Sequence, residues 1–127
     1  MSPVGFRRLD LNKVRTEIER YAADVGRREP DVQRVSLFGS LATGNATGSS
    51  DADLLIVVDH SEEPFHQRTG RFMTAELPVP VDVFVYTLAE LDEAVTEGRG
   101  FLYEALASSR TLYVRPTPAT IGAPLGR

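Results

Sequence analysis

The sequence contains no cysteine, and this absence excludes two kinds of site. Without cysteine there is no disulfide framework and no zinc site built on thiolates. The 127 residues also hold no apolar run of about 18 residues, so the sequence predicts no membrane-spanning helix. The first residues lack the hydrophobic core of an export signal, and we therefore expect a cytoplasmic protein.

Basic residues and histidine are also scarce. The chain has 14 Lys and Arg against 18 Asp and Glu, a net charge of −4. Neutralisation of phosphates by Lys and Arg drives binding to nucleic-acid polymers, so this balance disfavours such a partner. His60 and His66 have no Ser or Cys in an arrangement that would indicate a hydrolase triad. We expect both histidines at the solvent or at the edge of the core.

The length and composition indicate one globular domain. A hydrophobic content of 42% and a charged content of 25% are ordinary for a soluble protein of this kind. A chain of 127 residues can bury about two-thirds of its surface on folding. We expect the domain to span residues 1–115. Residues 116–127 carry three prolines and two glycines without periodicity, which predicts a disordered tail.

Hydrophobic periodicity predicts an α/β (α+β) fold, with a small mixed sheet of about four strands packed with helices. A helix is expected to begin at Asp10 or Asn12 and to run to about Arg28, since apolar residues recur there at intervals of three and four. The sequence Thr87-Leu88-Ala89-Glu90 is a capping box that begins a later helix. The strands are expected at residues 34–38, 54–58, 79–86 and 111–114, with a short helix at 101–108.

Two amphipathic stretches give more detailed expectations. The acids at Glu62 and Glu63 beside Pro64 suggest a helix start. The buried stripe of this helix would consist of Phe65, Thr69, Phe72, Met73 and Leu77. In the helix that follows Thr87, the side chains expected to point inward are Leu88, Leu91 and Val95. Arg68 and Arg71 lie about one turn apart; they either reach a triphosphate or serve as ordinary surface residues.

The most informative stretch begins at Gly39-Ser40. A strand that ends at Phe38 is broken there by a residue without Cβ and a residue with a hydroxyl. A backbone that closely approaches a bulky anion needs glycine, and free N–H groups with a Ser hydroxyl can bind phosphate oxygens. Ser40 is expected to open a short turn of helix, whose dipole would also favour phosphate.

Three carboxylates follow this loop. Asp51 and Asp53, after ten intervening residues, open the apolar run that ends at Val58. Alternate residues of a strand share a face, so both carboxylates project to the same side. Asp82 lies inside a second apolar strand, where an acid is costly without a partner or metal. If the two strands are neighbours, three carboxylates meet and can hold two Mg²⁺ ions about 3.5–4 Å apart.

The ordered series of Gly39-Ser40, Asp51-x-Asp53 and Asp82 resembles the signature of the DNA polymerase β-like nucleotidyltransferase superfamily. The chain is most similar to the minimal nucleotidyltransferases, which are often encoded beside a HEPN-domain partner. The resemblance covers roughly Val35 to Val114, although only the motif residues are specific. One departure is clear: many relatives carry arginines just after the Gly-Ser pair, where this chain has Leu41 and Thr43.

The resemblance implies a Mg²⁺-dependent nucleotidyltransferase. A hydroxyl acceptor would attack the α-phosphate of ATP or another NTP and release pyrophosphate. The expected catalytic and metal-binding residues are Asp51, Asp53 and Asp82, and Gly39 and Ser40 are expected to bind the nucleotide phosphates. The implied partner is a HEPN-type toxin, which would make this chain the antitoxin of the pair.

Simpler interpretations exist for each part of the motif. Taken singly, Gly39-Ser40 is an ordinary turn, Asp51 a turn residue, Asp53 a solvated edge residue and Asp82 an outward-pointing acid. The missing arginines after Ser40 also leave a second function open, that of a non-catalytic module which neutralises or scaffolds a helical partner by contact alone.

Overall fold

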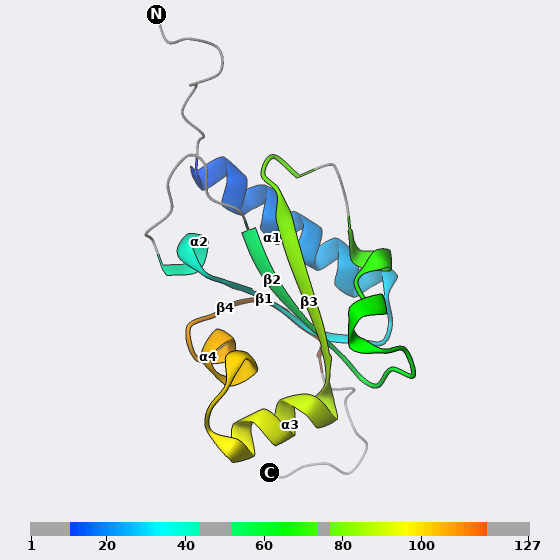
Figure 1. The fold of residues 1–127 in the computed structure, drawn as a ribbon. Coiled ribbons are helices and arrows are strands. Elements are labelled where there is room, and N and C mark those ends of the chain that lie inside the picture. The colour runs from blue at the N-terminus through cyan, green and yellow to red at the C-terminus, as the bar shows by residue number, and fades with distance from the viewer. Residues whose placement is uncertain (1–10, 44–51, 74–76, 117–127) are drawn as a thin grey trace, which may run out of the picture.

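A four-stranded mixed sheet forms the centre of the molecule (Figure 1). The computed structural model describes residues 11–43, 52–73 and 77–116. The strand order is β3-β2-β1-β4; β2 and β3 run parallel, while β1 is antiparallel to both β2 and β4. The expected mixed sheet of about four strands is therefore confirmed. The elements are α1 (Leu11–Arg28), β1 (Val32–Phe38), α2 (Ser40–Thr43), β2 (Ala52–Val58), the 3₁₀ turns η2 (Phe65–Gln67) and η3 (Gly70–Phe72), β3 (Val81–Thr87), α3 (Leu88–Glu97), α4 (Phe101–Ala107) and β4 (Arg110–Val114).

The sheet separates two hydrophobic clusters. One cluster joins α1 to one face of the sheet and includes Ile18, Val25, Leu54 and Val83. The other cluster joins α4 to the opposite face and is centred on Leu55 and its neighbours. Because β2 is buried on both faces, six of its seven residues are fully covered, which explains its continuous apolar sequence. Each such buried aliphatic side chain contributes about 1.5–3 kcal/mol to stability.

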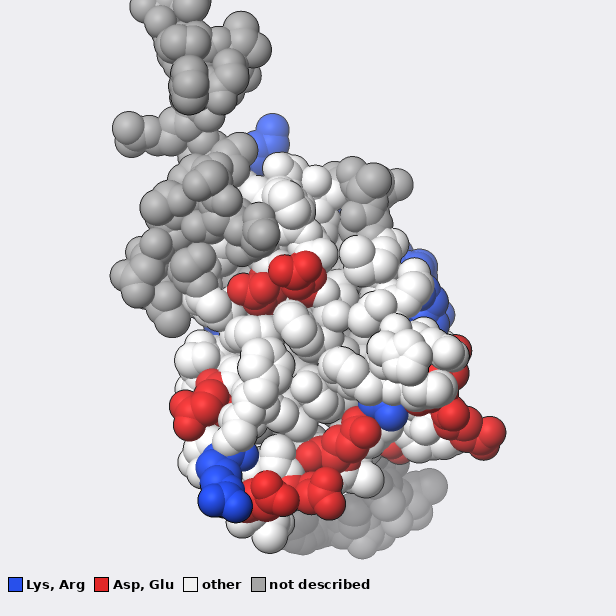
Figure 2. Space-filling view, in the orientation of Figure 1, with Lys and Arg blue, Asp and Glu red and all other residues white. Residues whose placement is uncertain are grey.

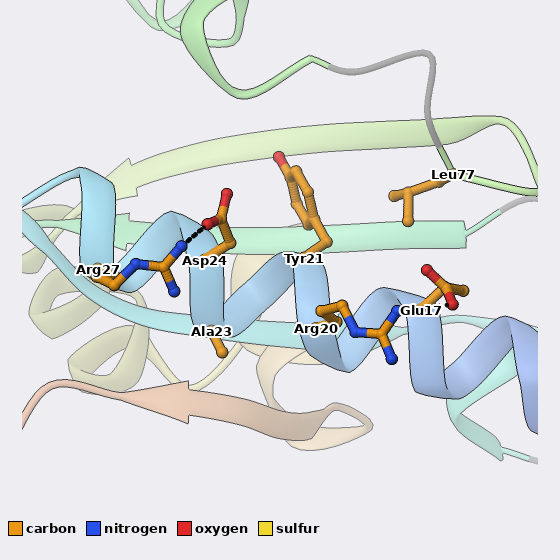
Figure 3. Close-up of a pocket in the computed structure, with 7 residues that line it drawn as sticks. All are labelled: Glu17, Arg20, Tyr21, Ala23, Asp24, Arg27 and Leu77. Carbon is orange, nitrogen blue, oxygen red and sulfur yellow. Dashed lines mark hydrogen bonds and ion pairs between the residues drawn. The ribbon is translucent and has the colours of Figure 1, made fainter.

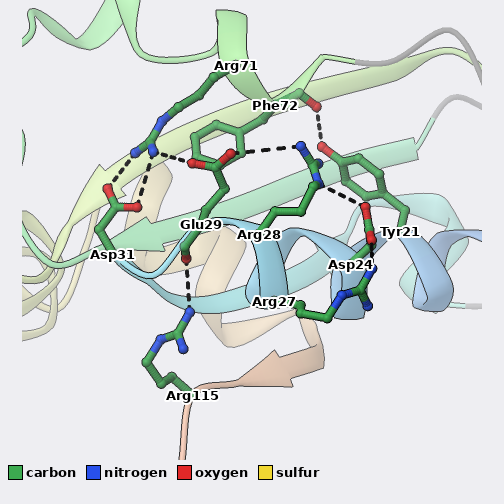
Figure 4. A network of polar contacts seen from close by, with 9 residues as sticks. All are labelled: Tyr21, Asp24, Arg27, Arg28, Glu29, Asp31, Arg71, Phe72 and Arg115. Carbon is green, nitrogen blue, oxygen red and sulfur yellow. Dashed lines mark hydrogen bonds and ion pairs between the residues drawn. The ribbon is translucent and has the colours of Figure 1, made fainter.

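Helix α1 is anchored at its C-terminal end by a residue from the far end of the chain. Arg115 donates to the carbonyl oxygens of Gly26 (2.6 Å), Glu29 (2.9 Å) and Val32 (2.7 Å), as Figure 4 shows in part. A cation at this end also interacts favourably with the helix dipole. Arg115 thus ties the segment after β4 to the junction between α1 and β1. No helix in the described part of the chain is both long and apolar enough to cross a membrane.

The same end of α1 holds a polar network (Figure 4). The hydroxyl of Tyr21 donates to the carbonyl of Phe72, and burial raises the pKa of Tyr21 to about 12. Arg71 donates to Glu29 (2.6 Å) and binds the carboxylate of Asp31, which holds the pKa of Asp31 below its usual range. These contacts fix the turn η3 against α1 and the segment that follows it.

The segment between β2 and β3 corrects one expectation. Instead of one amphipathic helix from Glu62 onward, the described residues form only the 3₁₀ turns η2 and η3. Of the expected stripe, Phe72 is buried, whereas Phe65 and Met73 are 39% and 53% exposed. Gly70 is the first residue of η3 and weakens any continuous helix.

Helix α3 is covered less than its sequence suggests. The capping box is confirmed, since Glu90 N–H donates to Thr87 Oγ1 (3.1 Å) and Thr87 N–H to Glu90 Oε1 (2.9 Å). However, the helix has no buried residue: Leu91 is half-buried, and the expected inward residues Leu88 and Val95 are exposed. The expectation for these two residues was wrong because α3 contacts the sheet mainly through Leu91 and Ala94.

Candidate active site

Asp53 and Asp82 are direct neighbours across the sheet. The two residues are register partners in the parallel pair β2–β3. The pairing extends to the residue before β3, since Ala52 N–H donates to the carbonyl of Pro80 (2.9 Å). Register partners on adjacent strands share a face, and their backbones lie about 4.8 Å apart. The expectation that the two strands are neighbours is confirmed, and their register places Asp53 and Asp82 side by side on one face of the sheet.

Both acids lie on the face that carries α4. Residues two positions further along the same strands, Leu55 and Phe84, belong to the cluster beneath α4. Asp53 also pairs with Phe38 of β1, so Phe38, Asp53 and Asp82 form one row across three strands, here called the acid row. Asp82 is exposed and Asp53 is half-buried. Figure 2 shows this face, on which acidic side chains outnumber basic ones.

Gly39 lies directly beneath the carboxylate of Asp53. Its φ of +81° is a left-handed conformation that strains any residue with a Cβ. A Cβ at this position would lie 2.5 Å from Asp53 Oδ2, far inside van der Waals contact. The glycine that the sequence places before the polar loop therefore has two roles. It permits the turn after β1, and it leaves room for the first carboxylate of the acid row.

We expect Gly39→Ala to lower about 100-fold the rate of the nucleotide transfer that the sequence resemblance implies, because the methyl group must displace the Asp53 carboxylate. Its cost in stability should be about 1–2 kcal/mol from the positive φ alone. Gly98→Ala is the matched control, because Gly98 also has a positive φ (+68°), yet a Cβ added there would meet no atom within 4 Å. Similar losses of activity in both variants would show that strain, and not the acid row, explains the effect.

The short helix α2 begins at Ser40, as the sequence predicts. Helix α1 contacts the first turn of α2, since Arg15 Nη2 donates to the carbonyl of Leu41 (3.1 Å). The side chain of Leu41 is buried. Arg15 Nε is buried without a hydrogen-bond partner among the described residues. Arg15 could not be identified from the sequence, because the charged residues of this helix are typical of a solvated face. A contact 26 residues apart leaves no local sequence signal.

Several expected site residues lie elsewhere or outside the described part of the chain. Asp51 and the loop before it are outside the described residues, as is the side chain of Ser40. Within the described ranges no group of three or more acids or histidines is placed to hold a metal ion. Arg68 is buried against Glu90, and Arg71 binds Asp31, so neither is oriented toward a triphosphate in the acid row.

A separate cavity of about 530 Å³ lies along α1 (Figure 3). Its charged lining residues pair with one another: Arg20 with Glu17 (3.0 Å) and Arg27 with Asp24. Helix α1 covers the face opposite the acid row, so this cavity is far from the two carboxylates. Paired, exposed charges of this kind indicate a solvated helix surface. We therefore place the candidate site at the acid row.

Comparison with known proteins identifies the family. A family model described as a nucleotidyltransferase domain matches residues 18–98, which is more than half of the chain. This protein belongs to that nucleotidyltransferase family. The matched span contains Gly39, Asp51, Asp53 and Asp82, and no curated protein matches the chain. Nucleotidyl transfer is therefore the general activity that the family membership supports.

A solved structure supports the fold of this nucleotidyltransferase independently. A crystal structure of a "putative nucleotidyltransferase" from Sulfolobus solfataricus is similar with a TM-score of 0.60 and 21% sequence identity. The match covers 83% of this chain and 84% of the other. At this identity the likeness shows the shared fold alone.

The donor set of the acid row fits a hard divalent cation. Asp53 and Asp82 present carboxylate oxygens from adjacent strands, and such oxygens are the ligands that Mg²⁺ prefers. Two like charges at this spacing repel each other unless a cation or proton lies between them. Family members generally use an NTP with a divalent metal, and these two residues are the described positions that could hold it.

Proposed function

We propose that this nucleotidyltransferase transfers AMP from ATP, with Mg²⁺, to a hydroxyl group of an acceptor. The observation that carries the proposal is the register pairing of Asp53 and Asp82. Gly39 supports it, because its missing side chain leaves space for the Asp53 carboxylate. The family match supports the general reaction. The acid row is open to solvent at Asp82, so an acceptor can approach it.

Each residue has a distinct role in the proposed reaction. Asp51 and Asp53 hold the metal-bound triphosphate, and Gly39 and Ser40 bind its β- and γ-phosphates. The acceptor oxygen attacks the α-phosphorus as its proton passes to the Asp82 carboxylate; the bond to the β-phosphate breaks, and pyrophosphate leaves. Mg²⁺, two ions when fully bound, would neutralise the charge that develops on the transferring phosphoryl group. The chain contributes mainly position and charge, the terms that dominate such transfers.

For the acceptor we propose a protein of the HEPN type, with this chain acting as the antitoxin of a toxin–antitoxin pair. The support is the resemblance of the motif series to minimal nucleotidyltransferases. The alternative is contact-only neutralisation of a helical partner. That alternative is motivated by Leu41, which stands where many relatives have an arginine and whose side chain is buried in the core.

The test is transfer of α-labelled AMP from ATP and Mg²⁺ to a purified HEPN-type partner. The proposal expects label on the partner protein, dependent on added Mg²⁺ and absent in the double variant Asp53→Asn, Asp82→Asn. Inhibition of the partner should be lost together with labelling. If the double variant still neutralises the partner fully and no label appears with the wild type, contact-only neutralisation replaces the transfer proposal.

A further inference from the structure

Three aromatic rings adjoin the acid row. Phe38 belongs to the row itself, and Phe84 follows Asp82 by two residues on the same face of β3. Phe101, the first residue of α4, contacts both rings, with centroids 5.8 Å from Phe38 and 5.3 Å from Phe84. Phe38 and Phe84 also contact each other at 5.6 Å. Phe101 thus reaches from β1 to β3 across β2. Its ring lies between the part of the sheet that α4 covers and the acid row.

Phe101 is not accounted for by core packing alone. Its neighbours Leu102 and Ala105 are buried beneath α4, whereas Phe101 remains 52% exposed. A cavity of about 330 Å³ opens beside it, with Tyr86 and Leu102 also in the lining. An aromatic ring that is half-covered by other rings and half-open to a cavity offers a surface for stacking a planar group.

The geometry of the proposed transfer indicates which planar group would stack on Phe101. In an in-line displacement the attacking and leaving oxygens lie on opposite sides of the phosphorus. In the proposed reaction pyrophosphate is bound at Gly39, directly after β1, and the acceptor at Asp82 on β3. The line from the attacking oxygen to the leaving oxygen therefore runs across the strands. The nucleoside is attached at right angles to this line, and the strand direction, which leads from Asp82 to Phe84, is one of the directions open to it. Along β3, Phe84 is two residues from Asp82, about 7 Å by strand rise.

The charge around the cavity agrees with this direction. The residues that line the cavity include three acidic side chains and one basic side chain: Glu90, Glu93, Glu97 and Arg99. Such a rim repels a triphosphate and admits an uncharged ring. The two ends of a nucleotide are thereby separated, since the phosphates are favoured at the metal-binding end and the base at the aromatic end.

We propose that Phe101 is the stacking surface for the base of the bound nucleoside triphosphate, an inference that depends on the proposed nucleotidyl transfer. Phe38 and Phe84 support its ring from beneath. Stacking tolerates every base but strengthens with ring area, so purine triphosphates bind more tightly than pyrimidine triphosphates. The sequence alone indicates only an apolar helix residue at Phe101, because its place beside the acids depends on how α4 crosses the sheet.

The test is calorimetric titration of the full chain in Mg²⁺ with ATP and with ribose 5′-triphosphate, which lacks the base. We expect Phe101→Leu to weaken ATP binding about tenfold and to leave binding of ribose triphosphate unchanged, because leucine retains apolar packing without a ring face. Phe101→Tyr should restore ATP affinity. Thermal unfolding of each variant checks that α4 remains packed.

The outcomes of this titration distinguish failure of the stacking role of Phe101 from failure of the proposed nucleotidyl transfer. Equal weakening of both ligands by Phe101→Leu would make Phe101 a structural residue and overturn the stacking role. Unchanged ATP binding with a raised KM for the acceptor would assign the ring to the acceptor instead and also overturn it. Failure of the wild type to bind either triphosphate would overturn nucleotide binding itself, whereas equal wild-type affinity for both would remove only the base subsite.

Discussion

We expect Asp82→Asn to lower the rate of the proposed AMP transfer about a thousandfold and to leave the fold intact, which is the largest effect on activity among our predictions. Asparagine has nearly the same shape, and Asp82 is exposed on the edge strand β3, so little packing changes. The variant loses the carboxylate that we propose takes up the proton of the attacking hydroxyl, a role that contributes about 10²–10⁴ in rate. It also removes half of the described negative charge of the acid row.

The measurement is single-turnover transfer from α-labelled ATP, with circular dichroism and thermal unfolding as checks of structure. Asp59→Asn is the matched control, because Asp59 is exposed and follows the opposite end of β2. We expect this control to retain transfer within about twofold, since it lies outside the acid row. Equal activity of Asp82→Asn and the wild type would remove Asp82 from the reaction and leave Asp53 to be tested alone.

The acid row shows how far strand periodicity alone can predict a site. Alternation along each strand is enough to place Asp53 and Asp82 on one face of their own strands. Whether the two faces coincide depends on β2 and β3 being adjacent, parallel and in register, which is a tertiary property. The motif spacing suggested this adjacency through family resemblance. Periodicity by itself supplies the face but not the partner.

Contacts between distant segments explain what the sequence could not show. Arg15 supports α2 from α1, and Phe101 reaches the acid row from α4; each contact joins residues far apart in the chain. Likewise, the pattern of residues 65–77 satisfies helical spacing, but only Phe72 of that stripe is buried among the described members. The segment between β2 and β3 is instead held in place by Arg68, a charged residue that a periodicity argument assigns to the surface.

Arg68 joins three elements from a buried position. Its side chain is only 9% exposed; its guanidinium binds both oxygens of Glu90 (2.7 and 3.3 Å) and the carbonyls of Glu63 (3.0 Å) and Val85 (3.2 Å). These bonds connect the segment after β2, the end of β3 and the capping box of α3. The same guanidinium holds the pKa of Glu90 below its usual value of 4.5.

We expect Arg68→Met to reduce the free energy of unfolding by about 2–3 kcal/mol, the largest loss of stability among the changes considered. Methionine retains the apolar stem, but two carbonyls and the Glu90 carboxylate each lose the hydrogen bonds from the guanidinium, and charge-assisted hydrogen bonds contribute about 1.5–3 kcal/mol. Arg71→Met is the matched control: Arg71 also binds a carboxylate with two nitrogens, yet its side chain is 42% exposed, so its loss should cost less than about 1 kcal/mol.

Urea unfolding at several pH values measures both effects. Because the pKa of Glu90 is lowered in the folded state, the pair with Arg68 contributes its full stability above about pH 4.5, and this contribution falls as pH drops through the lower folded value. The stability difference between wild type and Arg68→Met should therefore narrow on acidification. Equal losses in the Arg68 and Arg71 variants, with no change on acidification, would show that burial gives Arg68 no special role in joining β3 to α3.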